Sequence, residues 1–241
     1  MASTSTSTST ATLPLVAIED VFKIYREGDV ETVALRGASM TVEKGEFVAI
    51  VGRSGSGKST LLNIIGGLAE PTAGRAMVAG VDLARADEDT RASVRRKRVG
   101  VVFQSDNLIP FLTAEENVAL PMQLAGRSGA KARARTLLDD LGIGSRRGHR
   151  PDQLSGGEKQ RVAIATALAN EPDILLADEL TGELDTVNTD AVMDELAKLN
   201  GRGTTLIVVT HNPRVAERAH RVLHITDGRI EESETADVRN A

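Results

Sequence analysis

The sequence predicts an α/β fold with a mainly parallel sheet core, and two observations carry this prediction. Short runs of consecutive apolar residues, such as Leu206–Val209, alternate with longer helical patterns along most of the chain. Runs that are apolar throughout are typical of strands buried on both faces of a parallel sheet, and their alternation with helices is typical of α/β proteins. No strand pattern interrupts residues 113–170, which predicts a helical insertion.

The individual elements follow from these patterns and from the turn residues between them. Gly28–Asp29 and Lys44–Gly45 follow the first two strands, while Gly66–Gly67 and Pro71 stop the first helix. The predicted strands are 16–25, 38–42, 47–51, 99–103, 174–177, 206–209 and 222–225. The predicted helices are 58–68, 87–98, 130–141, 158–169, 186–199 and 213–219.

The two ends of the chain differ in composition from the part between them. Residues 2–12 are a Ser/Thr repeat that cannot bury apolar surface, so we expect disorder there. The last ten residues are polar. We therefore expect a tail over 1–13, a single domain over 14–231 with a helical subdomain at about 105–170, and a polar tail over 232–241.

Composition disfavours several classes of protein. One tyrosine, four phenylalanines and a net charge of −5 argue against a nucleic-acid partner, because such surfaces usually carry stacked aromatics or a basic excess. The absence of cysteine excludes disulfide scaffolds and cysteine nucleophiles. No stretch approaches the length of about 18 apolar residues that a membrane helix needs. The N-terminal segment has neither the basic start nor the apolar centre of a secretory signal, so we expect a soluble, cytoplasmic protein.

A phosphate-binding loop lies between a predicted strand and a predicted helix. Residues 52–59 read GRSGSGKS, follow the strand 47–51 and open the helix at Lys58, which is the context this motif requires. Glycines let successive backbone N–H groups turn inward around an anion, and the helix start adds unpaired donors. Lys58 is expected to reach the β- and γ-phosphates, and the Ser59 hydroxyl to bind Mg²⁺.

Two acidic residues follow the buried strand 174–177. Asp178 and Glu179 come where this strand leaves the sheet at its carboxyl edge. Asp178 is the candidate Mg²⁺ ligand, and Glu179 is the candidate base that orients and deprotonates the attacking water. An Asp–Glu pair after a strand is common, so it gains weight only from the phosphate loop beside it.

A second helix start with anion-binding character begins after Leu154. Residues 154–161 read LSGGEKQR, in which Ser155 is a plausible N-cap and Gly156 and Gly157 allow a close backbone approach. A simple capped helix is the alternative, and physical arguments alone do not separate the two.

Taken together, these motifs resemble the ATP-binding-cassette (ABC) ATPase family over residues 15–230. Besides the phosphate loop, the LSGGE signature and the acidic strand end, three further motifs match in order. Gln104 matches the Q-loop, Leu184–Asp185 the D-loop, and His211 the switch histidine. Tyr25 matches the aromatic residue that stacks on adenine. The resemblance implies a P-loop NTPase (RecA-like) core with an N-terminal antiparallel β subdomain and an all-helical insertion.

The resemblance also implies a mechanism with ATP and Mg²⁺. Two such domains form a head-to-tail homodimer, in which each phosphate loop faces the signature of the partner. The implied catalytic residues are Glu179, His211, Lys58 and Gln104, and the implied metal ligands are Ser59, Gln104 and Asp178. The implied ATP-binding residues are Tyr25, Gly52, Arg53, Ser54, Gly55, Ser56, Gly57, Lys58, Ser59, Thr60, Ser155, Gly156, Gly157 and Asp185.

Four residues depart from the family pattern. Leu180 stands where proline is usual after Glu179, and Glu183 stands where asparagine is usual. Glu158 replaces the commoner glutamine of the signature, and Thr166 replaces a usual arginine. None of these changes removes an implied catalytic group. Leu180 and Glu183 favour a reduced turnover rate as an alternative.

Several further segments resemble the branch of macrolide exporters, lipoprotein-release ATPases and division-associated ATPases. They are residues 32–37, 61–68, 102–110 and 112–121. This branch implies an integral membrane permease as partner, with residues 107–121 contributing to its docking groove, and a location on the cytoplasmic face of the membrane. The alternative within the branch is a low-turnover regulatory subunit of a division-type complex. A chromosome-structure ATPase would need a long coiled-coil insertion, and no sustained heptads occur.

Overall fold

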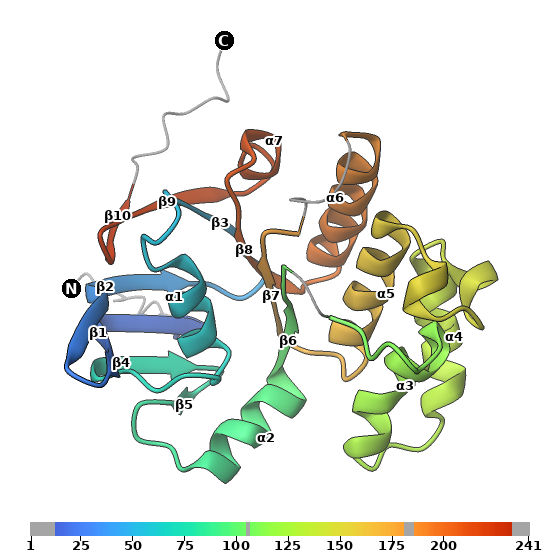
Figure 1. The fold of residues 1–241 in the computed structure, drawn as a ribbon, viewed down its shortest axis with the longest axis horizontal. Helices are drawn as coiled ribbons and strands as arrows, with labels where there is room; N and C mark the ends of the chain where they lie inside the picture. Colours follow the sequence, from blue (N-terminus) through green and yellow to red (C-terminus); the bar gives the residue numbers. More distant parts are fainter. Residues whose placement is uncertain (1–12, 105–106, 181–185, 233–241) are drawn as a thin grey trace, which may run out of the picture.

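The computed structural model describes residues 13–104, 107–180 and 186–232. Two sheets and a helical lobe make up the molecule, and they lie side by side along its longest axis (Figure 1). The antiparallel sheet lies at one end, the mainly parallel sheet in the middle, and the helices of the predicted insertion at the other end. The predicted α/β fold is therefore confirmed.

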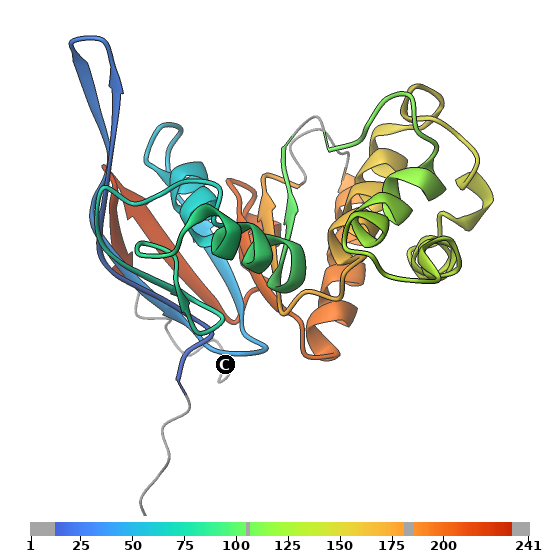
Figure 2. The ribbon, with the colours of Figure 1, turned by 90° about the horizontal axis from the view of Figure 1, so that it is seen from below.

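The antiparallel sheet is built from the N-terminal part of the chain. It consists of β1 (Val16–Glu27), β2 (Val30–Val42), β4 (Ala73–Val78) and β5 (Val81–Asp82), in the order β2-β1-β4-β5. The hairpin of β1 and β2 turns at Gly28–Asp29, as predicted, and its tip projects beyond the rest of the molecule (Figure 2).

The central sheet carries the phosphate loop and the acidic strand end. Its strand order is β10-β9-β3-β8-β7-β6, and all neighbours are parallel except β10 and β9. The strands are β3 (Phe47–Val51), β6 (Val99–Val102), β7 (Ile174–Asp178), β8 (Thr205–Val209), β9 (Arg221–Thr226) and β10 (Arg229–Glu232).

Both faces of the central sheet are buried, which explains its apolar sequences. On β7, Ile174 and Leu176 belong to a core cluster shared with the antiparallel sheet, whereas Leu175 and Ala177 belong to a second cluster shared with the helical lobe. The first cluster includes residues of α1 (Lys58–Ile65) and α2 (Glu88–Arg98). The second includes residues of α5 (Gly156–Leu168), α6 (Thr186–Gly201) and α7 (Pro213–Ala216).

The helical lobe contains no strand between residues 113 and 170, as the sequence predicted. It is formed by α3 (Ala114–Leu124), α4 (Ala130–Asp140), the short 3₁₀ helices η1 (Gly144–Arg146) and η2 (Pro151–Gln153), and α5. Thr113 and Glu116 start α3 with a reciprocal capping box.

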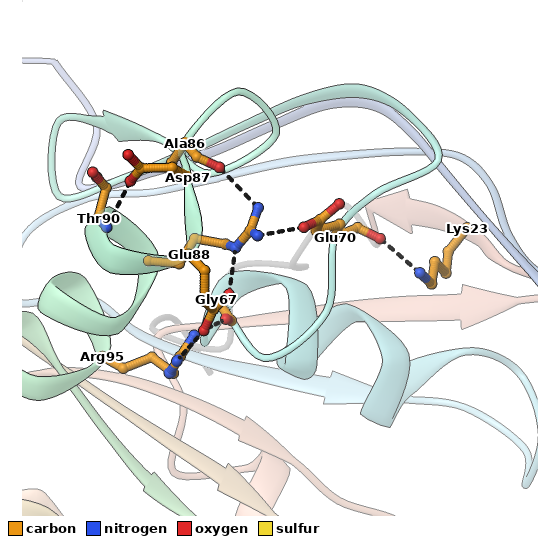
Figure 3. A network of polar contacts seen from close by, with 9 residues as sticks. Lys23, Gly67, Glu70, Ala86, Asp87, Glu88, Thr90 and Arg95 are labelled. Atoms are coloured by element: carbon orange, nitrogen blue, oxygen red, sulfur yellow. Dashed lines mark hydrogen bonds and ion pairs between the residues drawn. The ribbon is translucent and has the colours of Figure 1, made fainter.

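A polar network ties α2 to the segment that follows α1 (Figure 3). The Asp87 carboxylate caps α2 by accepting from the Thr90 backbone N–H at 2.9 Å. Arg95 pairs with Glu88 and donates to the Gly67 carbonyl, while the Lys23 ammonium donates to the Glu70 carbonyl at 2.8 Å. These contacts therefore link α2 and β1 to the segment that follows α1.

Several elements differ from the sequence-based prediction. β2 begins at Val30 rather than at residue 38, and α1 ends at Ile65 rather than at residue 68. The strands β4, β5 and β10 were not predicted. β4 contains Gly74 at φ +91°, a residue type that weakens strand patterns, and it is held by pairing with β1. In the described part of the chain, every helix is too short or too polar to cross a membrane.

Candidate nucleotide-binding site

The phosphate loop needs its glycines for two physical reasons. Gly55 and Gly57 adopt φ values of +77° and +105°, a region that L side chains rarely enter. A Cβ atom on Gly52 would lie 2.3 Å from the Ile225 carbonyl oxygen. A Cβ atom on Gly57 would lie 2.5 Å from the Ala34 carbonyl oxygen. The loop therefore packs closely against β9 at Gly52 and against β2 at Gly57, and a side chain at either position would clash.

The start of α1 leaves backbone N–H groups of its first turn available for a ligand. Gly57 is the N-cap residue, so no side chain caps the helix, and the first turn holds no acidic residue. Lys58 is buried and donates to the carbonyl oxygens of Gly52 and Arg53 at 2.9 Å each. The Ser56 hydroxyl is buried and has no hydrogen-bond partner among the residues that the structure describes. An uncapped, buried cluster of donors fits an anion.

The predicted phosphate and magnesium residues line one cavity. Lys58, Ser59 and Thr60 reach it from α1, Gln104 from the end of β6, and Asp178 with Glu179 from the end of β7. Ser54 and Gly55 of the loop also line it. Gly52, Arg53 and Ser56 border an adjacent cavity on the side of β9.

Glu179 forms the centre of a small polar group. It has a φ of +48°, and its backbone N–H donates to the Val209 carbonyl at 3.0 Å. Gln104 Nε2 donates to one carboxylate oxygen of Glu179 at 3.3 Å, and His211 Nδ1 lies 3.4 Å from the other. Since β6, β7 and β8 are neighbours, their ends bring these three predicted catalytic side chains together.

The second helix start is capped by its own residues. The Ser155 hydroxyl accepts from the Glu158 backbone N–H at 3.3 Å, and the Glu158 carboxylate accepts from the Ser155 backbone N–H at 2.8 Å. Ser155 and Gly156 are exposed, whereas Gly157 is buried. None of the three lines the cavity beside the phosphate loop. Within one chain, the structure therefore does not bring the signature to the phosphate loop.

Tyr25 lies next to the cavity rather than in its lining. It lies on β1 opposite Thr32 of β2, and the residue is 40% exposed. The Lys23 ammonium lies 5.0 Å from the ring centroid. Thr32 lines the cavity, so Tyr25 lies one strand away from the cavity wall. The predicted D-loop residues Leu184 and Asp185 lie outside the described residues.

Some residues of the site were not found by sequence reasoning. Thr32, Val33 and Ala34 of β2 form one wall of the cavity. The Gly228 N–H donates to the Ser56 carbonyl at 3.0 Å, while the Gly228 carbonyl accepts from Arg36 N–H at 2.8 Å. These contacts depend on packing between distant segments. The sequence around Gly228 carries no local phosphate motif that would have indicated them.

The comparisons with known proteins agree with this geometry. The family model described as ABC transporter matches residues 35–182. An ABC transporter ATP-binding protein of Thermotoga maritima is 50% identical over 219 residues, which cover 90% of this chain and 94% of that protein. The macrolide export ATP-binding/permease protein MacB of Hyphomonas neptunium is 47% identical over 90% of this chain, which spans only 34% of the MacB protein.

Two solved structures of the cassette MJ0796 also match closely. One is a dimer in a post-hydrolysis state bound to ADP and Pi, with a TM-score of 0.84 and 43% identity over 90% of this chain and 98% of that chain. The other is a dimeric bacterial ABC transporter cassette, with a TM-score of 0.85, 43% identity and coverage of 90% and 97%. The chain therefore belongs to the ABC transporter family, and it is an ATP-binding ATPase cassette of that family.

Proposed function

We propose that this chain hydrolyses ATP as one half of a head-to-tail homodimer that drives a membrane permease. One observation carries the proposal: Lys58, Ser59, Gln104, Asp178 and Glu179 come from three separate elements and line the same cavity. A site for a triphosphate needs cationic donors, oxygen ligands for a divalent cation and a carboxylate base, and the cavity supplies all three.

The residues beside the phosphate loop fit Mg²⁺. The Ser59 hydroxyl, the Asp178 carboxylate and the Gln104 amide oxygen are the hard oxygen ligands that this cation prefers. The described residues contain no group of three or more acids and histidines that could hold a metal alone. Phosphate oxygens would therefore complete the ligand set, as is usual for nucleotide-bound magnesium. When bound, the cation neutralises negative charge on the phosphates.

Glu179 is the proposed general base, and its neighbours control its position. Its carboxylate is engaged by Gln104 and His211 from two adjacent strand ends. Gln104 is proposed to sense the cation, and His211 to contact the γ-phosphate. Binding of ATP would therefore redirect both side chains away from Glu179, which frees the carboxylate to orient and deprotonate water.

A second copy of the chain would complete the site. Ser155, Gly156 and Gly157 are proposed to bind the γ-phosphate of the partner in trans, because they do not reach the phosphate cavity of their own chain. Asp185 is proposed to signal across this interface. The dimeric state of both MJ0796 structures supports the arrangement. ATP then holds the dimer together, and hydrolysis releases it.

A groove between α2, α3 and α5 is the proposed docking surface for the permease. Its lining includes the apolar residues Val101, Leu120 and Pro121 together with Arg95 and Arg96. Exposed Leu124 lies at the groove, and exposed Phe111 lies in the segment that leads to α3. The printed name of the MacB relatives joins an ATP-binding part and a permease. Such docking would place the chain on the cytoplasmic face of a membrane.

Replacing the proposed base tests the proposal. Glu179→Gln is expected to bind ATP with unchanged affinity but to lower steady-state turnover by about 100-fold or more, since general bases contribute roughly 10²–10⁴. The variant should also accumulate as an ATP-bound dimer, measured by light scattering after size-exclusion chromatography. Glu171→Gln, which changes an exposed acid remote from the cavity, is the matched control. Turnover near the parent rate in Glu179→Gln would contradict the proposal.

A low-turnover regulatory subunit is the second candidate. Leu180 follows Glu179 and is buried, and the Glu179 carboxylate already accepts from Gln104 and lies 3.4 Å from His211 Nδ1. If those contacts persist with ATP bound, the chain would bind ATP and hydrolyse it slowly. ATPase rates measured with and without membranes that contain the permease separate a stimulated motor from a regulatory subunit.

A further inference from the structure

The signature helix carries a negative charge at its start. Glu158 occupies the third position of α5, and its Oε2 accepts the Ser155 backbone N–H at 2.8 Å. The pKa of the Glu158 carboxyl lies below its ordinary value, because the carboxylate accepts from the Ser155 N–H and from Arg146, and because the positive charge of Arg146 is close. An acidic residue in the first turn stabilises its own helix through the helix dipole.

The same charge opposes binding of an external anion at this place. By contrast, α1 has no acidic residue in its first turn. A phosphate approaching the N-terminus of α5 would meet the Glu158 carboxylate in addition to the helix donors, and like charges a few ångströms apart repel. A cation paired with Glu158 would reduce this repulsion.

Arg146 of η1 supplies that cation. Its Nε donates to Glu158 Oε1 at 3.0 Å, while the other carboxylate oxygen remains on Ser155 N–H. The side chain of Arg146 is 47% exposed and that of Glu158 is 19% exposed. The chain thus uses both oxygens of Glu158: one caps the helix, and the other is neutralised by a residue 12 positions earlier.

We propose that Arg146 is a positioning residue that neutralises Glu158, so that the start of α5 can receive the γ-phosphate of ATP bound to the partner cassette. This inference rests on the proposed head-to-tail dimer. Arg146 itself holds Glu158 and does not need to touch ATP. A consequence is that a neutral residue at 158 makes Arg146 dispensable. Glutamine is the appropriate replacement, because it can retain the capping box.

The experiment is a double-mutant cycle in the Glu179→Gln background, with ATP-dependent dimerisation as the readout. Arg146→Ala is expected to weaken the dimer by about tenfold, since each of two symmetric sites gains an uncompensated charge. ATP affinity of the monomer, measured by calorimetry, should stay unchanged. Glu158→Gln should dimerise at least as well as the parent, and Arg146→Ala/Glu158→Gln should match Glu158→Gln alone.

The control removes an equivalent ion pair elsewhere in the helical lobe. Arg135 of α4 pairs with Glu115 of α3 at 2.8 Å, with exposures of 54% and 14%, so this ion pair joins two other helices of the lobe. Arg135→Ala should leave dimerisation unchanged. A double variant as weak as Arg146→Ala, or an Arg146→Ala dimer as strong as the parent, overturns the inference. If the Glu179→Gln parent itself fails to dimerise with ATP, the proposed function fails instead.

Discussion

The two helix starts proposed to bind phosphate are built in opposite ways. α1 begins at a glycine in the left-handed region, without a side-chain cap or an acidic residue in its first turn. α5 begins with a reciprocal capping box between Ser155 and Glu158, and Arg146 binds the acid. In the described structure, no side chain caps the start of α1, whereas the side chains of Ser155 and Glu158 accept from two backbone N–H groups at the start of α5.

In the proposed dimer, this difference lets the two helix starts divide the binding of one ATP molecule. An uncapped start surrounded by β2 and β9 is ready to hold phosphates as soon as the chain is folded. A capped and exposed start is stable alone and is available to a second molecule. The comparison predicts that changes at α1 alter ATP binding by one chain, and that changes at α5 alter assembly or stability instead.

The largest expected effect comes from the buried lysine of α1. Lys58→Ala should lower the ATP affinity of the monomer by about 100-fold, because hydrogen bonds to charged groups contribute roughly 1.5–3 kcal/mol each. Lys159→Ala, which removes an exposed lysine from the first turns of α5, is the matched control and should leave this affinity unchanged. Isothermal calorimetry measures both. Equal losses in the two variants would remove the distinction between the helix starts.

A smaller effect is expected at the ring that flanks the cavity. Tyr25→Ala should raise the apparent KM for ATP by about tenfold, since stacking of an aromatic ring on a base contributes roughly 1–3 kcal/mol. Tyr25→Phe keeps the ring and should behave like the parent. An unchanged KM in Tyr25→Ala would show that Tyr25 only packs beside Lys23.

The capping residue of α5 separates stability from assembly. Ser155→Ala should lower the free energy of unfolding by about 1 kcal/mol, the usual loss for a Ser or Thr cap. Thr113→Ala removes the same type of capping box from α3 and should have a similar effect in urea denaturation. Of the two, only Ser155→Ala should also weaken ATP-dependent dimerisation. If both variants dimerise equally well, Ser155 acts as a cap alone.

The smallest expected effect is a dependence of stability on acid. The hydrogen bonds of the caps and nearby arginines hold the pKa values of Asp87, Glu116 and Glu158 below their ordinary values. A lowered pKa in the folded state contributes stability above the ordinary value and loses it as pH falls through the lowered value. Thermal melting should therefore shift downward below about pH 4, and Glu158→Gln should shift slightly less. A melting temperature independent of pH between 3 and 6 would contradict this.

The phosphate loop and the acidic strand end could be predicted because each is a local pattern. GRSGSGKS follows its strand directly, and Asp178–Glu179 follow an apolar run, so register and packing were not needed. The wall formed by Thr32, Val33 and Ala34 could not be predicted in the same way. It depends on how β2 pairs with β1 and how both lie over the loop.

The fold shows the same division between local and distant determinants. The apolar strands of the central sheet were predicted within a few residues, because burial on both faces leaves a strong sequence pattern. β4 was missed because Gly74 interrupts a strand that is stabilised by its pairing with β1. The Arg146–Glu158 pair was also missed, since nothing in the spacing of those residues indicates that η1 lies beside α5.

The contact of Gly228 with the phosphate loop has a consequence for how the protein is synthesised. Ser56 is made early, yet its carbonyl is held by Gly228, which follows β9 near the other end of the chain. A nascent chain that has already emerged with its GRSGSGKS sequence still lacks this support. Because a ligand stabilises only states in which its site exists, we expect ATP to stabilise this chain mainly after β9 and Gly228 have packed against the loop.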